Sequence, residues 1–116
     1  MVCFDMKYEV VLLEPAMDFL RKLEGKLQAK AFRSIGLLGY FGPQLLMPHS
    51  RKLTGYDLWE LRVQQAGSIC RLFYFHSKDK LYVVTSGYVK KSDKTNPGEI
   101  RRALRLKAEY LGGIVE

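Results

Sequence analysis

The chain has 116 residues, of which 47% are hydrophobic and 27% charged. This length fits one domain with a single core, here expected to span residues 1–116, and the apolar content excludes a disordered chain. Lys and Arg outnumber Asp and Glu by 19 to 12, and a net charge of +7 points to nucleic acid, an acidic partner or a membrane surface.

The first half of the sequence predicts one strand and two helices. The run Tyr8–Leu13 contains aromatic and β-branched residues, as strands do. Pro15 follows at a position suited to the first turn of a helix. After Gly25, a second helix is predicted from Lys26 to about Leu38 because apolar residues recur at helical spacing. Several glycines and prolines then favour an extended loop over residues 40–57.

The second half predicts three consecutive strands and a helix. The strands cover residues 58–63, 69–75 and 81–89, and the short turns between them indicate antiparallel neighbours. In the first strand, Trp59 begins an apolar face and Glu60 a polar one. Asn96 and Pro97 are a typical start for the last helix.

The element order is therefore β-α-α-β-β-β-α. This order predicts an α+β fold, a small twisted and largely antiparallel sheet. An N-terminal helical hairpin and a C-terminal helix would pack on that sheet.

Cysteine use and hydropathy favour a cytoplasmic protein without a membrane segment. Cys3 and Cys70 form no CxxC motif and no disulfide framework. No apolar run approaches the ~18 residues of a membrane span. The first residues lack the basic and apolar regions of a secretory signal.

The familiar nucleotide, metalloprotease and nucleophile motifs are absent from the sequence, and so is a His/Cys cluster with zinc spacing. We therefore expect no metal and no cofactor. An enzyme of this composition would act by positioning its substrate and by positive charge. RNA cleavage suits such groups, because the substrate's own 2′-hydroxyl is the nucleophile.

The strongest local charge bias lies between residues 90 and 107, with seven cations and two anions. Lys90 and Lys91 directly follow an apolar strand that would hold them in place, so they are candidates for binding phosphate. Arg101, Arg102 and Arg105 are better explained as the solvated face of a helix.

Arg71 is unusual because it lies inside the otherwise mostly apolar run 69–75. A guanidinium in a buried strand needs a partner or an opening to solvent. Two interpretations remain open: an ion pair with Glu60 or Asp57, or a fixed cation that clamps a phosphate with two hydrogen bonds.

Other residues would extend a basic site around Arg71. His49 is the candidate acid or base, although a single histidine in a loop more often has neither role. The candidates for contacts with RNA are Arg51, Lys52, Tyr88 and Lys94.

Four segments in this order resemble the HigB-type branch of the RelE/ParE toxin superfamily, including its phage-derived members. The resemblance covers roughly residues 7–111, and the segments that carry it are 52–62 (KLTGYDLWELR), 71–74 (RLFY), 87–91 (GYVKK) and 95–100 (TNPGEI). It implies the toxin of a type II toxin–antitoxin module. RelE-like members are ribosome-dependent endoribonucleases that cut mRNA in the ribosomal A site.

The resemblance also implies partners and site residues. The partners would be a helix-turn-helix antitoxin, the ribosome and mRNA, with no direct DNA binding without the antitoxin. Arg71 matches the arginine that contacts the scissile phosphate. Lys90 and Lys91 match the basic residues after the last strand, so these three are the candidate catalytic residues. Tyr110 has the spacing of a packing residue, so the general base is unassigned.

Two other functions remain open. The ParE-like branch shares the fold but inhibits DNA gyrase by binding it, which requires no set of phosphate-binding residues. An inactive phage-derived relative would only bind a partner.

Overall fold

A computed structural model describes residues 7–90 and 95–112 of the chain. The helices and strands in these ranges are β1 (Glu9–Leu12), α1 (Glu14–Arg21), α2 (Gly25–Phe41), the short 3-10 helix η1 (Gly42–Gln44), β2 (Ser50–Lys52), β3 (Trp59–Gln65), β4 (Ser68–Lys78), β5 (Leu81–Val89) and α3 (Pro97–Gly112). The fold is α+β, as the sequence predicts.

The strands form one sheet in the order β1-β5-β4-β3-β2. β1 runs parallel to β5, and the other neighbours are antiparallel. Ala66 and Gly67 join β3 to β4, and both have positive φ angles, of 48° and 86°. Such two-residue turns match the twist of the strands they join. The three predicted consecutive strands are therefore confirmed as β3, β4 and β5.

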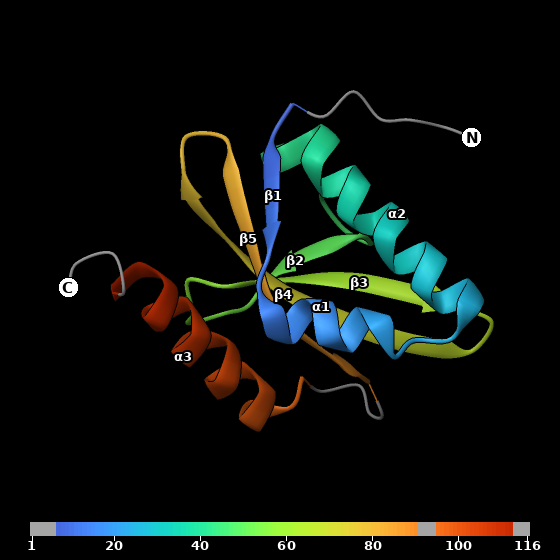
Figure 1. Ribbon diagram of the computed structural model, residues 1–116. Helices are drawn as coiled ribbons and strands as arrows, with labels where there is room; N and C mark the ends of the chain where they lie inside the picture. The colour runs from blue at the N-terminus through green and yellow to red at the C-terminus, as the bar shows by residue number, and fades with distance from the viewer. Residues whose placement is uncertain (1–6, 91–94, 113–116) are drawn as a thin grey trace.

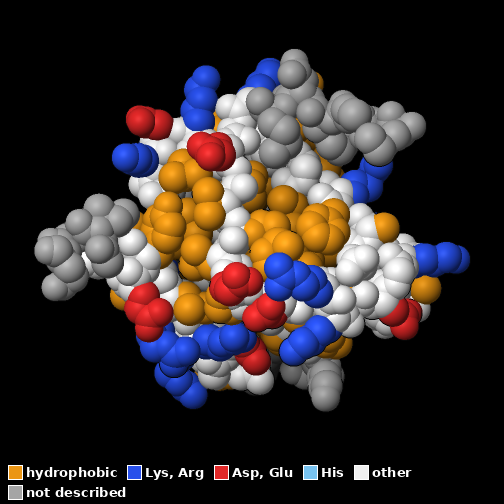
Figure 2. Space-filling view, viewed as in Figure 1, with side chains coloured by type: hydrophobic (Ala, Val, Ile, Leu, Met, Phe, Trp, Pro, Cys, Tyr) orange, Lys and Arg blue, Asp and Glu red, His pale blue; other side chains and the backbone are white. Residues whose placement is uncertain are grey.

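Alternation along β4 divides the core between the two faces of the sheet. Leu72 and Tyr74 face the core formed with α1 and α2, whereas Phe73 packs with Ile100 and Ala103 of α3. The helical hairpin and α3 thus cover opposite faces, and their arrangement around the sheet can be followed in Figure 1. In the same view, Figure 2 shows hydrophobic side chains over the middle of the molecule and charged side chains of both signs around its margin.

The loop predicted for residues 40–57 is wrong in two respects. Helix α2 continues through Gly36 and Gly39 to Phe41, because its inner face packs on the sheet. It ends at Gly42, whose φ of 56° favours glycine. The three residues of β2 also pair with the outer edge of β3. A strand this short has no periodicity of its own and depends on its neighbour.

Helix α3 begins as the sequence predicts. The Asn96 side chain accepts a hydrogen bond from the Gly98 N–H group at 2.8 Å, and Pro97 takes the first helical position. This cap fixes where α3 begins, before the helix packs on its face of the sheet. Within the described ranges, the helices are too short or too polar to cross a bilayer.

Gly87 lies where α1 meets the sheet, and we expect Gly87→Ala to destabilise the protein. A Cβ atom there would lie 2.6 Å from side-chain atoms of both Leu72 and Phe19, too close for either to remain in place. Overpacking of this kind costs about 1–3 kcal/mol, which urea unfolding would measure. Gly25→Ala is the control, because a Cβ atom there would meet nothing within 4 Å apart from its chain neighbours and the backbone of its own helix. Equal stability of the two variants would contradict this packing.

Candidate functional site

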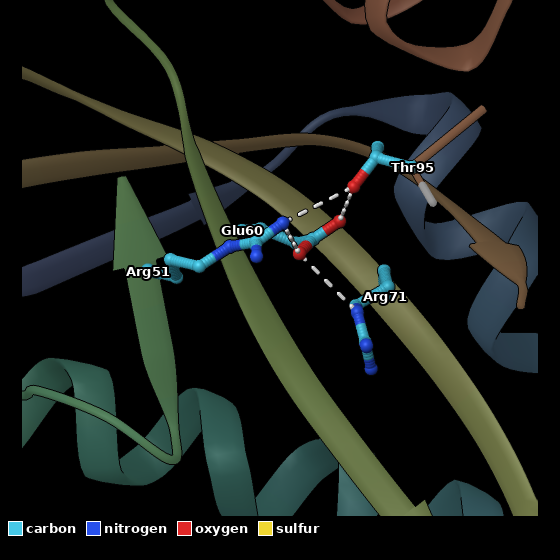
Figure 3. A network of polar contacts seen from close by, with 4 residues as sticks. All are labelled: Arg51, Glu60, Arg71 and Thr95. Atoms are coloured by element: carbon cyan, nitrogen blue, oxygen red, sulfur yellow. Dashed lines mark hydrogen bonds and ion pairs between the residues drawn. The ribbon is translucent and has the colours of Figure 1, made fainter. Parts of the chain in front are cut away.

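The carboxylate of Glu60 is buried on the face of the sheet that α3 partly covers. Its side chain has no exposure to solvent. One oxygen, Oε1, lies 3.2 Å from Nε of Arg71 and 3.5 Å from Nη2 of Arg51. The other, Oε2, accepts a hydrogen bond of 3.0 Å from the hydroxyl of Thr95. Figure 3 shows the three groups converging on this one carboxylate.

Strand register explains this convergence. Arg51 of β2 lies directly opposite Glu60 of β3, and Arg71 of β4 lies opposite Arg62, two residues further along the same face. Thr95 arrives from the segment between β5 and α3, and it also accepts a hydrogen bond of 3.4 Å from Arg51. The network thus connects the edge strand, the centre of the sheet and the start of the last helix.

Of the two interpretations left open for Arg71, the ion pair with Glu60 is confirmed. The other predicted partner, Asp57, instead binds Lys107 of α3 at 3.0 Å. Arg71 is not on an open sheet face, since only 3% of the residue is exposed. Its Nη1 is buried without a hydrogen-bond partner among the described residues, and Figure 3 shows the outer end of the guanidinium directed away from Glu60. The pair therefore leaves part of the guanidinium unused.

Positive charge accumulates around Arg71. Burial lowers the pKa of its guanidinium, Glu60 opposes that effect, and the charge of Arg62 lowers the pKa further. Lys90, half-buried after β5, has a lowered pKa as well, because of burial and then the charge of Arg71. A single carboxylate thus faces several cations, which leaves an excess of positive charge that favours an anion.

The structure places the other predicted site residues in different surroundings. His49 lies at the same edge of the sheet as Arg62, whose N–H group donates to the His49 carbonyl at 2.8 Å. Lys52 pairs with Trp59 on the opposite face from Arg51, so it is not brought together with Arg71. Lys91 and Lys94 lie outside the described residues.

Tyr88 is on the same face as Arg71, directly opposite it on β5. Its ring already stacks on Phe73, with centroids 5.6 Å apart and planes at 15°. Burial and then the negative charge of Glu60 raise the pKa of its hydroxyl. The ring of Tyr88 is thus packed into the core between the sheet and α3. Stacking on an RNA base would use only the outer side of the ring.

Sequence reasoning missed two members of this site. Arg62 alternates with Glu60 in the predicted strand, so the period-two pattern already placed it on the face of Glu60. The strand register then puts it opposite Arg71. Thr95 gave no such signal, because its contact with Glu60 spans 35 residues. The burial of Glu60 was also unexpected for a residue on the polar face.

The described residues contain no cluster of three His, Cys, Asp or Glu side chains that would hold a metal ion. Cys70 faces the core that the sheet forms with α1 and α2, where burial raises the pKa of its thiol to about 11. The thiol is therefore protonated near neutral pH, and it is a packing residue rather than a nucleophile.

A family model described as "Phage derived protein Gp49-like (DUF891)" matches residues 18–108, most of the chain. The chain belongs to this Gp49-like family. The resemblance to the phage-derived branch of the superfamily is thereby confirmed. No curated protein matches the sequence.

Two solved structures share the fold of this Gp49-like chain. A double arginine-to-alanine mutant of the E. coli toxin RelE in the free state matches with a TM-score of 0.63 and 20% identity, over 86% of this chain and 97% of that one. The intact E. coli RelBE toxin–antitoxin complex matches with a TM-score of 0.54 and 21% identity, over 75% of this chain and 99% of that one. The expected RelE-like fold is confirmed.

We expect Glu60→Gln to destabilise this Gp49-like chain strongly, because it leaves the buried Arg71 without its anion. Breaking a buried ion pair from one side costs about 3–5 kcal/mol, measurable by urea unfolding at pH 7. Asp57→Asn is the control, because it removes a carboxylate whose side chain is 86% exposed and costs at most about 1 kcal/mol. Similar small losses in both variants would show that Glu60 does not neutralise Arg71.

Proposed function

We propose that this chain is the toxin of a type II toxin–antitoxin module, of the HigB type, and that it cleaves mRNA on the ribosome without a metal. The observation that carries the proposal is the group of cations Arg62, Arg71 and Lys90 around one buried carboxylate, on a RelE-like fold. A surface that only binds gyrase does not require a buried arginine with an unused donor, which Arg71 is among the described residues. This feature therefore favours RNA chemistry over the ParE-like alternative.

The reaction would be an internal transesterification. The 2′-oxygen of one nucleotide attacks the adjacent phosphorus, the bond to the 5′-oxygen of the next nucleotide breaks, and a 2′,3′-cyclic phosphate forms. One proton leaves the 2′-hydroxyl and one reaches the departing 5′-oxygen, so the step needs no redox partner and no added water. Negative charge builds up on the phosphoryl oxygens during attack, and fixed cations stabilise it.

Each proposed catalytic residue has a role suited to its surroundings. Arg71 is held by Glu60 through Nε, so its other nitrogens are pre-positioned to donate to phosphoryl oxygens. Lys90, with its lowered pKa, would donate a proton to the departing oxygen more readily than an ordinary lysine. His49, exposed at the edge of the sheet beside Arg62, is the proposed base. Lys91 would add charge next to Lys90 in the sequence.

The proposed partners follow from this function. The ribosome would present the mRNA in an extended form, and Arg51, Lys52, Tyr88 and Lys94 would contact it. A helix-turn-helix antitoxin with acidic side chains would neutralise the toxin, as one of the matched structures is a toxin–antitoxin complex. Toxin and ribosome would meet in the cytoplasm.

The first test is induced expression in a bacterial host, with sequencing of mRNA 5′ ends. We expect new ends within translated frames, and none when the purified protein meets naked RNA. Growth arrest without new ends would point to gyrase or another protein target. The absence of both would indicate an inactive relative.

We expect Lys90→Ala/Lys91→Ala to relieve growth arrest and to abolish the new mRNA ends, because it removes the charge beside the reacting phosphate. Losing general acid catalysis alone lowers rates by about 10²–10⁴-fold. Lys78→Ala/Lys80→Ala is the control, since it removes the same charge from exposed positions at the other end of the sheet. Full toxicity of the Lys90/Lys91 variant, with soluble protein at equal levels, would disprove the assigned site.

A further inference from the structure

A cavity of about 230 Å³ opens at the edge of the sheet, beyond the point where β2 stops covering β3. Its polar lining comes from two directions. Helix α2 supplies Lys30, Arg33 and Ser34, and the sheet side supplies His49, Arg62 and Arg71. Of the described residues that line it, four carry a permanent positive charge and none carries a carboxylate.

Arg71 connects this cavity to the network around Glu60. Its Nε is paired with the carboxylate at 3.2 Å, and Arg71 is also one of the residues that line the cavity. Figure 3 shows the outer end of its guanidinium directed away from Glu60. Nη1 is buried and makes no hydrogen bond to any described residue. An unpaired buried donor costs about 1–3 kcal/mol, a cost that an acceptor entering the cavity would remove.

The size and chemistry of the cavity indicate its ligand. Water occupies about 30 Å³ per molecule in the liquid, so the space exceeds that of a single bound water or ion. It is smaller than the ~300–1,000 Å³ of typical cofactor pockets. Guanidinium groups recognise phosphate oxygens through paired hydrogen bonds, and Lys30 would add a point charge. These properties match a phosphate group.

We propose that this cavity between α2 and the edge of β3 is a phosphate-binding site that adjoins the proposed cleavage site, with Arg71 between the two. Its lining continues from Arg71 toward α2, in a different direction from β5. If the proposed RNA cleavage holds, the ligand is a backbone phosphate next to the one that is cut, and the cavity sets the path of the strand. The binding of phosphate itself does not depend on cleavage.

The test compares two double variants that lose the same charge. Lys30→Ser/Arg62→Ser removes two cations from the cavity. Lys26→Ser/Lys78→Ser removes two exposed lysines outside it, one of them a single helical turn before Lys30. The first variant should fold normally, because Arg62 and Arg71 repel each other. Urea unfolding of each variant verifies this.

The probes are inorganic phosphate and a short 2′-O-methyl RNA that cannot be cleaved, each titrated into the protein and followed by NMR. We expect the cavity variant to weaken phosphate binding by about tenfold and the control variant to change it little. Competition between RNA and phosphate would identify the RNA backbone as the source of the bound phosphate group. The salt dependence of RNA binding by the cavity variant should then correspond to about one to two fewer phosphate contacts. Phosphate binding that RNA does not displace would identify a free phosphate compound as the ligand.

Equal effects of the two double variants on phosphate binding, or no saturable phosphate binding by the wild-type protein, would overturn the proposal. Neither result depends on toxicity or on cleavage. A failure of the cavity is therefore distinguishable from a failure of the proposed ribonuclease function. A catalytically inactive protein that still binds phosphate at Lys30 and Arg62 would retain this site.

Discussion

The Glu60 carboxylate is closed to water, and the polar half of the sheet is arranged around it. A buried carboxylate is stable only when cations and hydrogen-bond donors take the place of its hydration. Arg71, Arg51 and Thr95 do so here, from three different segments of the chain. Correct pairing of β2, β3 and β4 and correct placement of the segment before α3 are all needed to satisfy this one group.

This dependence connects folding to the proposed chemistry. The ion pair takes Nε of Arg71 but leaves the outer part of its guanidinium directed elsewhere. An arginine fixed in this way loses little side-chain freedom when it binds an anion, so more of the binding free energy is retained. Burial, and after it the charge of Arg71, lowers the pKa of Lys90. The buried pair of Glu60 and Arg71 thus affects both the binding of an anion and the proposed proton transfer from Lys90.

The rest of the fold separates this polar region from the main core. The helical hairpin packs on one face of the sheet, and α3 covers only part of the other, with Ile100 and Ala103 over Phe73. The remaining part of that face and the adjacent edge are left to the cations. Because β2 spans three residues, the outer half of β3 stays free to border the cavity with α2. The short edge strand therefore helps to create the proposed phosphate site.

The sequence by itself determined the helical hairpin, the three long strands and the capped last helix, because periodicity and turn chemistry are local. It also identified Arg71 as a charged residue in an apolar strand and left its partner open between Glu60 and Asp57. Only the tertiary structure decided that partner, formed β2, carried α2 through two glycines and brought Thr95 to Glu60. It also placed Lys30 of α2 beside Arg62. These outcomes depend on contacts between residues far apart in the chain, and local propensity does not encode such contacts.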